Sequence, residues 1–171
     1  MKLTLIKDVK APKYNQLFYQ PTIAYNYYDG LILGVKLHNK PLIKRNLEFK
    51  TSPGYATKSN KLNGSFTVVY NQYFEKTSLY KISYGIVGTT LQYKPDLSYS
   101  ALIPYVNVQF KRKSLRDATA EFITAKTVLI QKEILPTAIK TEQDSYRVFS
   151  LSYNYINPDI ISETRFNIKT E

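Results

Sequence analysis

The stretch LFYQPTIAYNYYDGLILGVKLH, residues 17–38, decides the fold, because apolar residues alternate with other residues on both sides of a turn signal. The odd positions carry mostly Leu, Tyr, Ile and Val, and the even positions are mixed and more polar. A period of two is typical of β-strands with one apolar face. The Asp29–Gly30 pair between the two runs is a strong hairpin signal. The sequence therefore predicts two antiparallel strands joined by a tight turn.

The parity of the two runs fixes the length of the loop between them. A two-residue loop over Asp29 and Gly30 would pair Tyr28 with Leu31 and mix the two faces. A three-residue loop over Tyr28, Asp29 and Gly30 pairs Tyr27 with Leu31 and keeps one face apolar. We therefore predict a type I turn followed by a G1 bulge, with Gly30 in the left-handed conformation.

The same alternation continues along most of the chain. It marks strands within residues 46–50, 62–71, 81–86, 106–110, 149–155 and 165–169. The parity test also predicts a loop over 75–79 that sets Phe74 opposite Tyr80. The sequence thus predicts an all-β fold, an antiparallel up-and-down meander of about nine strands. We assign residues 1–171 to one domain or fragment, with an irregular lead-in over 1–15.

Three features interrupt this pattern. Residues 114–127 hold several alanines and allow either a strand or a short helix. The apolar parity changes within 79–93, which predicts a β-bulge near Val87–Gly88. Proline removes a ladder hydrogen bond, so in a barrel we expect bulges, or positions outside the hydrocarbon, at Pro21, Pro53 and Pro104.

Composition limits the chemistry available to the chain. There is no cysteine and a single histidine, His38, which excludes disulfides, thiolate metal sites, cysteine nucleophiles and most zinc or histidine-triad enzymes. No run of about 18 apolar residues is present, so no transmembrane helix is predicted. The N-terminus lacks the apolar core of a secretory signal peptide. The net charge of +11 raises nucleic acid or anionic membrane surfaces as partners, but the lysines are scattered.

Strand length and side-chain type favour a membrane barrel over a soluble one. Segments 61–74, 79–93, 98–111 and 144–156 reach the roughly 9–11 residues that a membrane-crossing strand needs. The second face is rich in small polar residues with scattered charges, which suits a wet interior.

Tyrosines also gather near the strand ends, and in an up-and-down barrel they would form two aromatic girdles. One rim would hold Tyr25, Tyr27, Tyr28, Tyr55, Tyr93 and Tyr99, and the other Tyr70, Tyr73, Phe74, Tyr80, Tyr153 and Tyr155. The alternative is that tyrosine simply has a high strand propensity.

We therefore predict part or all of a transmembrane β-barrel in the cell outer membrane. It would serve as an anchor or conduit for a larger surface or periplasmic protein, with the lipid bilayer as its partner. Two alternatives stay open: a soluble β-barrel or sandwich that binds a ligand in its interior, and a basic nucleic-acid-binding module. The second is the less favoured, and we do not expect nucleic acid as a partner.

The segment YNYYDGLILGVKLHNK, residues 25–40, resembles a pattern of β-barrel domains attached to gluzincin-type zinc metallopeptidases of the outer membrane. The matching residues are Tyr25, Asn26, Tyr28, Asp29, Gly30, Gly34, His38 and Asn39. The resemblance implies an outer-membrane location and a covalently linked peptidase domain upstream. Over the remainder only long alternating strands and short turns are shared.

No catalytic residue carries over from that resemblance. A gluzincin needs H-E-x-x-H, whereas His38 is followed by Asn39 and no second histidine exists. We therefore predict that this chain is not itself an enzyme. The final FNIKTE lacks the terminal aromatic residue of a complete barrel, so we expect strands missing at both ends.

A basic run is the first candidate contact site. Lys111, Arg112, Lys113 and Arg116 could bind the phosphates of lipid headgroups or nucleic acid, and a solvated loop is the alternative.

The remaining candidates are single residues or pairs. Asp29 could bind a cation, but a backbone role in its turn suffices to explain it. His38 could line a lumen or respond to pH, or it could be a plain surface residue. Glu142 and Asp144 have no histidine or nucleophile nearby in the sequence. We predict no catalytic, cofactor-binding or metal-binding residue and no cofactor.

Overall fold

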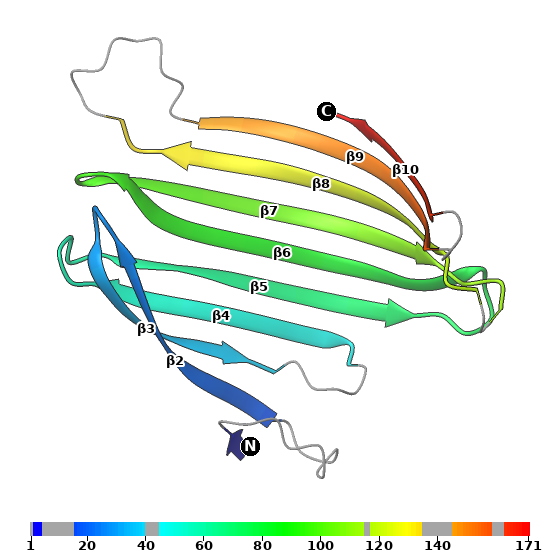
Figure 1. The fold of residues 1–171 in the computed structure, drawn as a ribbon, viewed down its shortest axis with the longest axis horizontal. Helices are drawn as coiled ribbons and strands as arrows, with labels where there is room; N and C mark the ends of the chain where they lie inside the picture. Colours follow the sequence, from blue (N-terminus) through cyan, green and yellow to red (C-terminus); the bar gives the residue numbers. More distant parts are fainter. Residues whose placement is uncertain (1, 5–15, 40–44, 115–116, 135–144, 159–162) are drawn as a thin grey trace.

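The fold, taken from a computed structural model, is one curved sheet of ten strands (Figure 1). The structure describes residues 2–4, 16–39, 45–114, 117–134, 145–158 and 163–171. The strands are β1 (Lys2–Thr4), β2 (Gln16–Asn26), β3 (Gly30–His38), β4 (Leu47–Ala56), β5 (Leu62–Tyr73), β6 (Leu79–Lys94), β7 (Leu97–Phe110), β8 (Ala120–Lys132), β9 (Ser145–Pro158) and β10 (Glu163–Thr170).

Each strand pairs with its neighbours in the sequence, and every pair from β2 to β10 is antiparallel. The predicted all-β, up-and-down meander is confirmed. Among the described residues, no pairing joins β10 to β1 or β2, and β1 and β10 form the two edges of the sheet.

The lead-in over 1–15 was predicted as irregular, and this is wrong for its first residues. Residues 2–4 form β1, which pairs in parallel with β2 and sets Leu3 beside Leu17. Residues 5–15 lie outside the described part of the chain.

The β2–β3 hairpin keeps the predicted parity but not the predicted register. Gly30 is left-handed, with φ +70°, as predicted. However, Asn26 pairs with Gly30, so the loop covers 27–29 rather than Tyr28, Asp29 and Gly30. The Asn26 side chain explains why the turn begins one residue earlier than predicted, because its Oδ1 accepts a hydrogen bond from the Tyr28 N–H at 3.2 Å. The faces are unchanged, because the pairing moves by two residues, to Tyr25 with Leu31.

Two further loop predictions have clear outcomes. The 75–79 loop is confirmed, since the Phe74 N–H donates to the Tyr80 carbonyl at 3.1 Å. Of the two readings of 114–127, the strand is correct from Ala120 onward.

The bulge near Val87–Gly88 is wrong. The register of β6 with β5 and β7 is continuous there, and its shifts lie between Leu79 and Lys81 and between Gln92 and Lys94. A Cβ on Gly88 would lie 2.1 Å from the ring of Phe66. Phe66, directly opposite on β5, therefore fills the apolar position that Gly88 leaves empty, and no bulge is needed.

The prolines are accommodated without bulges. Pro53 and Pro104 fall in short gaps of the β3–β4 and β7–β8 ladders, where neighbouring pairs keep the same register. Pro21 pairs with Val35 inside a continuous ladder. Interrupted hydrogen bonding at two of the three positions is the expected effect of the missing N–H.

Candidate functional site

The two faces of the sheet differ sharply in chemistry. Cross-strand partners point to the same side, so a run of partners across strands forms a row on one face. One row holds Phe49, Val68, Ile86 and Pro104, and we call its side the apolar face. Another holds Asn71, Ser83, Asn107, Thr124 and Ser152, and we call its side the polar face.

The apolar face is the exposed one. Ile23 is 75% exposed, Phe149 58% and Leu33 48%. Further exposed members are Tyr25, Leu31, Leu47, Tyr55, Leu62, Phe66, Val68, Tyr70, Tyr84, Leu102, Val106, Leu151, Phe166 and Ile168. The only buried apolar side chains among the described residues are Phe18, Ala56, Leu97 and Ala101. The described sheet therefore has no dry core of large apolar side chains.

The polar face is the buried one. Asn71, Ser83 and Ser150 lie on it and are at most 5% exposed, although the described residues form one layer. Small polar side chains become buried in a single layer when the sheet curves toward them. We conclude that the polar face is concave.

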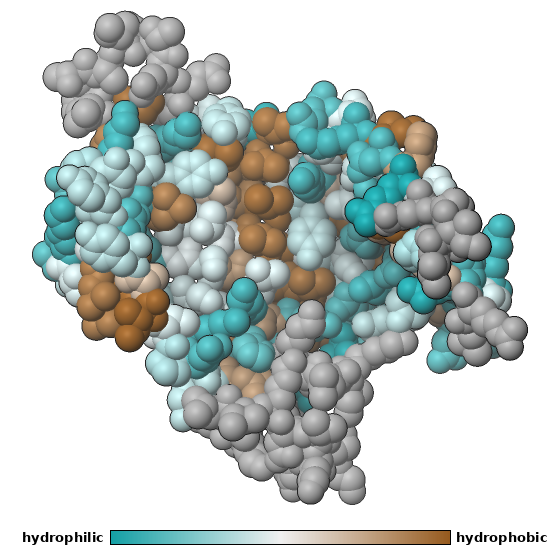
Figure 2. Space-filling view, viewed as in Figure 1, coloured by the Kyte–Doolittle hydropathy of each residue, from teal (hydrophilic) through white to brown (hydrophobic). Residues whose placement is uncertain are grey.

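Hydrogen bonds within the polar face link its strands. The Ser83 hydroxyl donates to Asn71 Oδ1 at 2.7 Å, and Asn107 Nδ2 donates to Thr124 Oγ1 at 2.7 Å. Figure 2 looks onto this face, where an apolar band crosses the middle strands between hydrophilic ends. On the polar face Val87 pairs with Ile103, and Val128 pairs with Val148. The concave surface is thus polar toward both rims and partly apolar at mid-height.

Charged residues follow the same division. Between the strand ends, the apolar face carries only Glu121 and Arg147 among the described side chains, and each lies where the apolar residues end. The polar face carries seven cationic side chains, at Lys36, Lys50, Lys81, Lys126, Lys132, Arg165 and Lys169.

The apolar zone is inclined to the strands. The row of Tyr19 on β2 passes through Leu37, Thr51, Phe66, Gly88, Leu102 and Leu129 and reaches Arg147 on β9. On β9 the zone ends at Tyr155, eight residues beyond Arg147, whereas on β2 it ends at Leu17, two residues before Tyr19. The edge of the zone that runs from Tyr155 to Leu17 therefore climbs six residues over the seven steps from β9 to β2.

The opposite edge of the apolar zone climbs eight residues over the same steps. On β2 the zone extends six residues past Tyr19 to Tyr25, and on β9 it stops at Phe149, two residues short of Arg147. The apolar residues therefore form a belt, six residues high on β9 and eight on β2 and β7, that crosses the strands obliquely.

The predicted tyrosine girdles are present in part. Tyr25 and Tyr55 are exposed on the apolar face near one rim. Near the other rim Tyr155 pairs with Phe166 on that same face. Other members of the predicted sets point elsewhere: Tyr73 pairs with Lys81 and Tyr99 with Lys132, both on the polar face.

Asp29 forms a buried cluster that joins three turns of one rim. Its carboxylate is fully buried and accepts hydrogen bonds from Asn63 Nδ2 at 2.6 Å, Ser59 Oγ at 2.9 Å and Asn26 Nδ2 at 3.1 Å. When the Gln92 side-chain amide is oriented so that both its nitrogen and its oxygen have partners, the nitrogen donates to Asp29 at 3.1 Å and the oxygen accepts from Lys61 at 3.2 Å. All of these partners except Asn26 come from other hairpins.

Main-chain bonds support the same junction. The Lys58 N–H donates to the Asp29 carbonyl at 2.9 Å, and Asn26 Nδ2 donates to the Gln92 carbonyl at 3.3 Å. Lys61 Nζ donates to the Asp96 carbonyl at 3.0 Å. The tip of the β2–β3 hairpin thus contacts β6, although three strands separate β2 from β6 in the sheet. This contact requires the sheet to curl. Protein donors already occupy the carboxylate, so Asp29 holds the rim together rather than presenting an open cation site.

The basic run is only partly brought together. Lys111 continues the β6–β7 ladder, with its N–H bonded to the Ser78 carbonyl at 2.8 Å, and its Nζ contacts the Glu75 carbonyl. Arg112 and Lys113 are exposed in the loop that follows, as the solvated-loop reading expects. Arg116 lies outside the described residues, as do Glu142 and Asp144.

Acidic side chains at the rims have lowered pKa values. Hydrogen bonds from the Thr119 side chain and then its N–H hold the pKa of Asp117 below its ordinary value. Hydrogen bonds from Ser98, including its N–H at 2.7 Å, likewise lower the pKa of Glu133. Both contacts fix loop ends beside the sheet.

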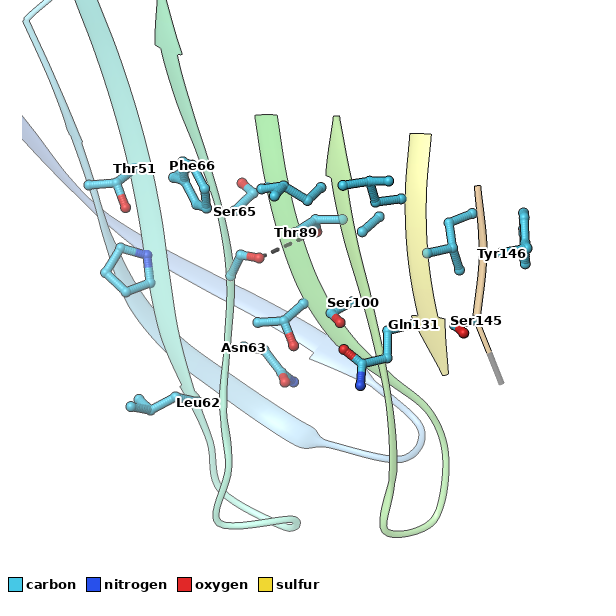
Figure 3. Close-up of a pocket in the computed structure, with 18 of the residues that line it drawn as sticks. Thr51, Leu62, Asn63, Ser65, Phe66, Thr89, Ser100, Gln131, Ser145 and Tyr146 are labelled. Atoms are coloured by element: carbon cyan, nitrogen blue, oxygen red, sulfur yellow. Dashed lines mark hydrogen bonds between the residues drawn. The ribbon is translucent and has the colours of Figure 1, made fainter. Parts of the chain in front are cut away.

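An open depression of about 880 Å³ lies on the apolar face near the Asp29 rim (Figure 3). Gly64 and the small side chains of Thr90 and Ser100 line it, together with the larger side chains of Phe66 and Leu129. It follows the edge of the belt, where the row through Gly64 turns polar at Gln131 and Ser145. The depression therefore marks a boundary of the apolar zone.

Other features give no catalytic constellation in the described part of the chain. His38 stacks on Phe18 with ring centroids 5.2 Å apart. No group of three or more His, Cys, Asp or Glu residues is placed to hold a metal ion among the residues described. No helix within those residues is long and apolar enough to cross a bilayer.

The chain was compared with protein-family models, with curated proteins and with solved structures, and none of the three comparisons found a match.

Proposed function

We propose that this chain forms part of the wall of a transmembrane β-barrel in an outer membrane. Its apolar face would contact acyl chains and its polar face would line the interior. The observation that carries this proposal is the reversal of burial: Ile23 and Phe149 are exposed, while Asn71 and Ser150 are buried. Closed ladders would satisfy the backbone within lipid, which is what a spanning structure requires.

The inclination of the apolar belt supports the same proposal. A climb of six to eight residues over seven strand steps, at about 3.3 Å per residue and about 4.8 Å between strands, corresponds to a tilt of about 30–40°. Strands of membrane barrels tilt by roughly 35–45°. A soluble sheet has no reason to keep an exposed apolar belt at this inclination.

The height of the belt is also suitable. On β7 it runs from Leu102 to Phe110, which are about 27 Å apart along the strand and about 21 Å apart along the normal at a tilt of about 40°. The apolar band of outer-membrane barrels is about 25 Å tall. The two charged residues of this face, Glu121 and Arg147, fall at the ends of the belt, where they would reach headgroups.

The role that follows is anchorage, or passage for solutes, for a larger protein. The resemblance of residues 25–40 adds the proposal that an upstream zinc metallopeptidase domain is joined to this wall. The coding sequence upstream of residue 1 tests that point, because such a domain requires an H-E-x-x-H motif.

Flotation with lipid vesicles tests the membrane role. The full chain, diluted from urea into phosphatidylcholine vesicles, should float with them, resist extraction by alkaline carbonate and show a far-UV circular dichroism spectrum of β-structure. Without lipid or detergent it should aggregate, because the exposed apolar belt then faces water. A folded, monodisperse species in plain buffer would contradict the proposal and favour the soluble barrel or sandwich. Steep salt-dependent retention on heparin would favour the nucleic-acid module.

A further inference from the structure

The charges of the concave polar face are unequal. Against its seven cationic side chains, the described side chains on that side include three acids, Glu48, Glu171 and, at the rim, Asp29, which is held by Asn26 and Asn63. Glu48 accepts a hydrogen bond from Asn71 at 3.4 Å, and Glu171 is ion-paired with Lys169. The described part of the concave side is therefore strongly cationic.

Two of these cations lie deep within the belt. Lys50 pairs with Thr67 and sits between Phe49 and Thr51, which belong to the apolar face. Lys126 pairs with Ser150 and is likewise flanked along its strand by residues of the apolar face. Both are therefore level with the centre of the lipid-facing belt but on the opposite side of the sheet.

One acid, Glu48, lies in their surroundings: it is two residues before Lys50 on the same face, and its charge acts on Tyr105, the partner of Lys126. Lys126 has Tyr105 and Ser150 as cross-strand partners, and the charge of Glu171 acts on the same region. Lys50 has His38 and Thr67 as partners. A charged amine at mid-height of a bilayer needs water or a mobile counter-ion on its own side of the wall.

We propose that the concave side is a water-filled path that concentrates small water-soluble anions. This inference rests on the proposed membrane role. Rings of Lys or Arg are the means by which pores favour anions and phosphates. A low-dielectric wall of one sign also raises the local concentration of the opposite ion. Val87, Ile103, Val128 and Val148 form an apolar row on this side at mid-height; Lys50 belongs to the same row, and Lys126 belongs to the next row.

The absence of native cysteine makes the potential at this wall measurable. Single cysteines replace Thr67 or Ser152 on the polar face, and Thr127 on the apolar face serves as the matched control. Each variant of the full chain is reconstituted in phosphatidylcholine vesicles and treated with sulfonatoethyl (anionic) or trimethylammonioethyl (cationic) methanethiosulfonate. The reaction rates are normalised to those of a free thiol.

After normalisation, we expect T67C and S152C to react at least about tenfold faster with the anionic reagent than with the cationic reagent. Adding Lys50→Gln and Lys126→Gln should bring the ratio toward that of the free thiol, whereas Lys58→Gln and Lys113→Gln, in the rim loops, should not. T127C should react with neither reagent.

The outcomes separate the two proposals. The anion path would be overturned if the ratio of anionic to cationic reaction rates at both polar-face positions is near or below that of the free thiol, or if neither position reacts. In either case an unreactive T127C leaves the membrane role intact. Rapid reaction of T127C with both reagents would overturn the membrane role itself. Two polar-face positions guard against one variant that fails to fold.

Discussion

An arginine placed on the apolar face should destabilise the membrane-inserted chain far more than one placed on the polar face. Val106 and Asn107 are adjacent on β7, so they differ in the face they present rather than in their place in the sequence. Val106 lies halfway between Leu102 and Phe110, which are the two ends of the belt on this strand. It should therefore lie near the bilayer midplane.

The magnitudes follow from that position. An arginine facing lipid at the midplane costs about 2–4 kcal/mol, which lowers the folding equilibrium constant about 30- to 700-fold. Asn107→Arg loses the 2.7 Å hydrogen bond to Thr124 but keeps its charge on the polar side, so we expect a cost of about 1 kcal/mol. Leu102→Arg, at the edge of the belt, should cost about 0–1 kcal/mol.

Urea titration of the vesicle-reconstituted chain, followed by far-UV circular dichroism, gives the three free energies of unfolding. The ranking Val106→Arg, then the two milder variants, is the expected result. Equal costs for Val106→Arg and Asn107→Arg, or a larger cost at Asn107, would refute the assignment of the apolar face to lipid.

Three further predictions concern the rims and one close contact, and the same urea titration reads all of them. Asp29→Ala should cost about 3 kcal/mol or more, because several buried donors lose a charged acceptor, whereas Asp96→Asn should stay within about 0.5 kcal/mol; similar costs would argue against the Asp29 cluster. Gly34→Ala should cost about 1–3 kcal/mol, because its Cβ would lie 2.5 Å from the Pro53 carbonyl oxygen, and a neutral effect would contradict that packing. The lowered pKa of Glu133 stabilises the fold above the pKa of the unfolded chain, and this contribution disappears as the pH falls through the lowered value. Glu133→Gln should therefore reduce the loss of stability in acid, and an unchanged acid profile would speak against the contact with Ser98.

The strand pattern could be predicted because it is local. A period of two assigned the faces correctly at Ile23, Leu33 and Val68, and the Asp-Gly signal placed a left-handed residue at Gly30. Parity does not set register, which can move by two residues without changing any face. The Asn26 side chain made that choice by binding the Tyr28 N–H.

The Asp29 cluster could not be predicted in the same way. Its members come from three hairpins, and only the curl of the sheet brings Ser59, Asn63 and Gln92 to the carboxylate. The sequence suggested a turn role for Asp29, with a cation site as the alternative, but no contact with other hairpins. A usable signal was present, because Asn26 and Asn63 are polar-face residues that flank turns of the same rim.

The bulge near Val87–Gly88 was predicted wrongly for a similar reason. The parity change within β6 looked like an extra residue, but Gly88 is covered by Phe66 from the neighbouring strand. A side chain that fills its neighbour's position cannot be recognised from one strand alone.

The central claim is that the apolar face contacts lipid, and a nitroxide scan along β8 tests it most directly. Single-cysteine labels at residues 122–129, in the full chain reconstituted in vesicles, are read by collision with oxygen and with a water-soluble nickel chelate. We predict alternation with a period of two, in which Ile123, Ala125 and Thr127 favour oxygen while Thr124 and Val128 favour nickel. The opposite phase, or nickel access at every position, would contradict the claim.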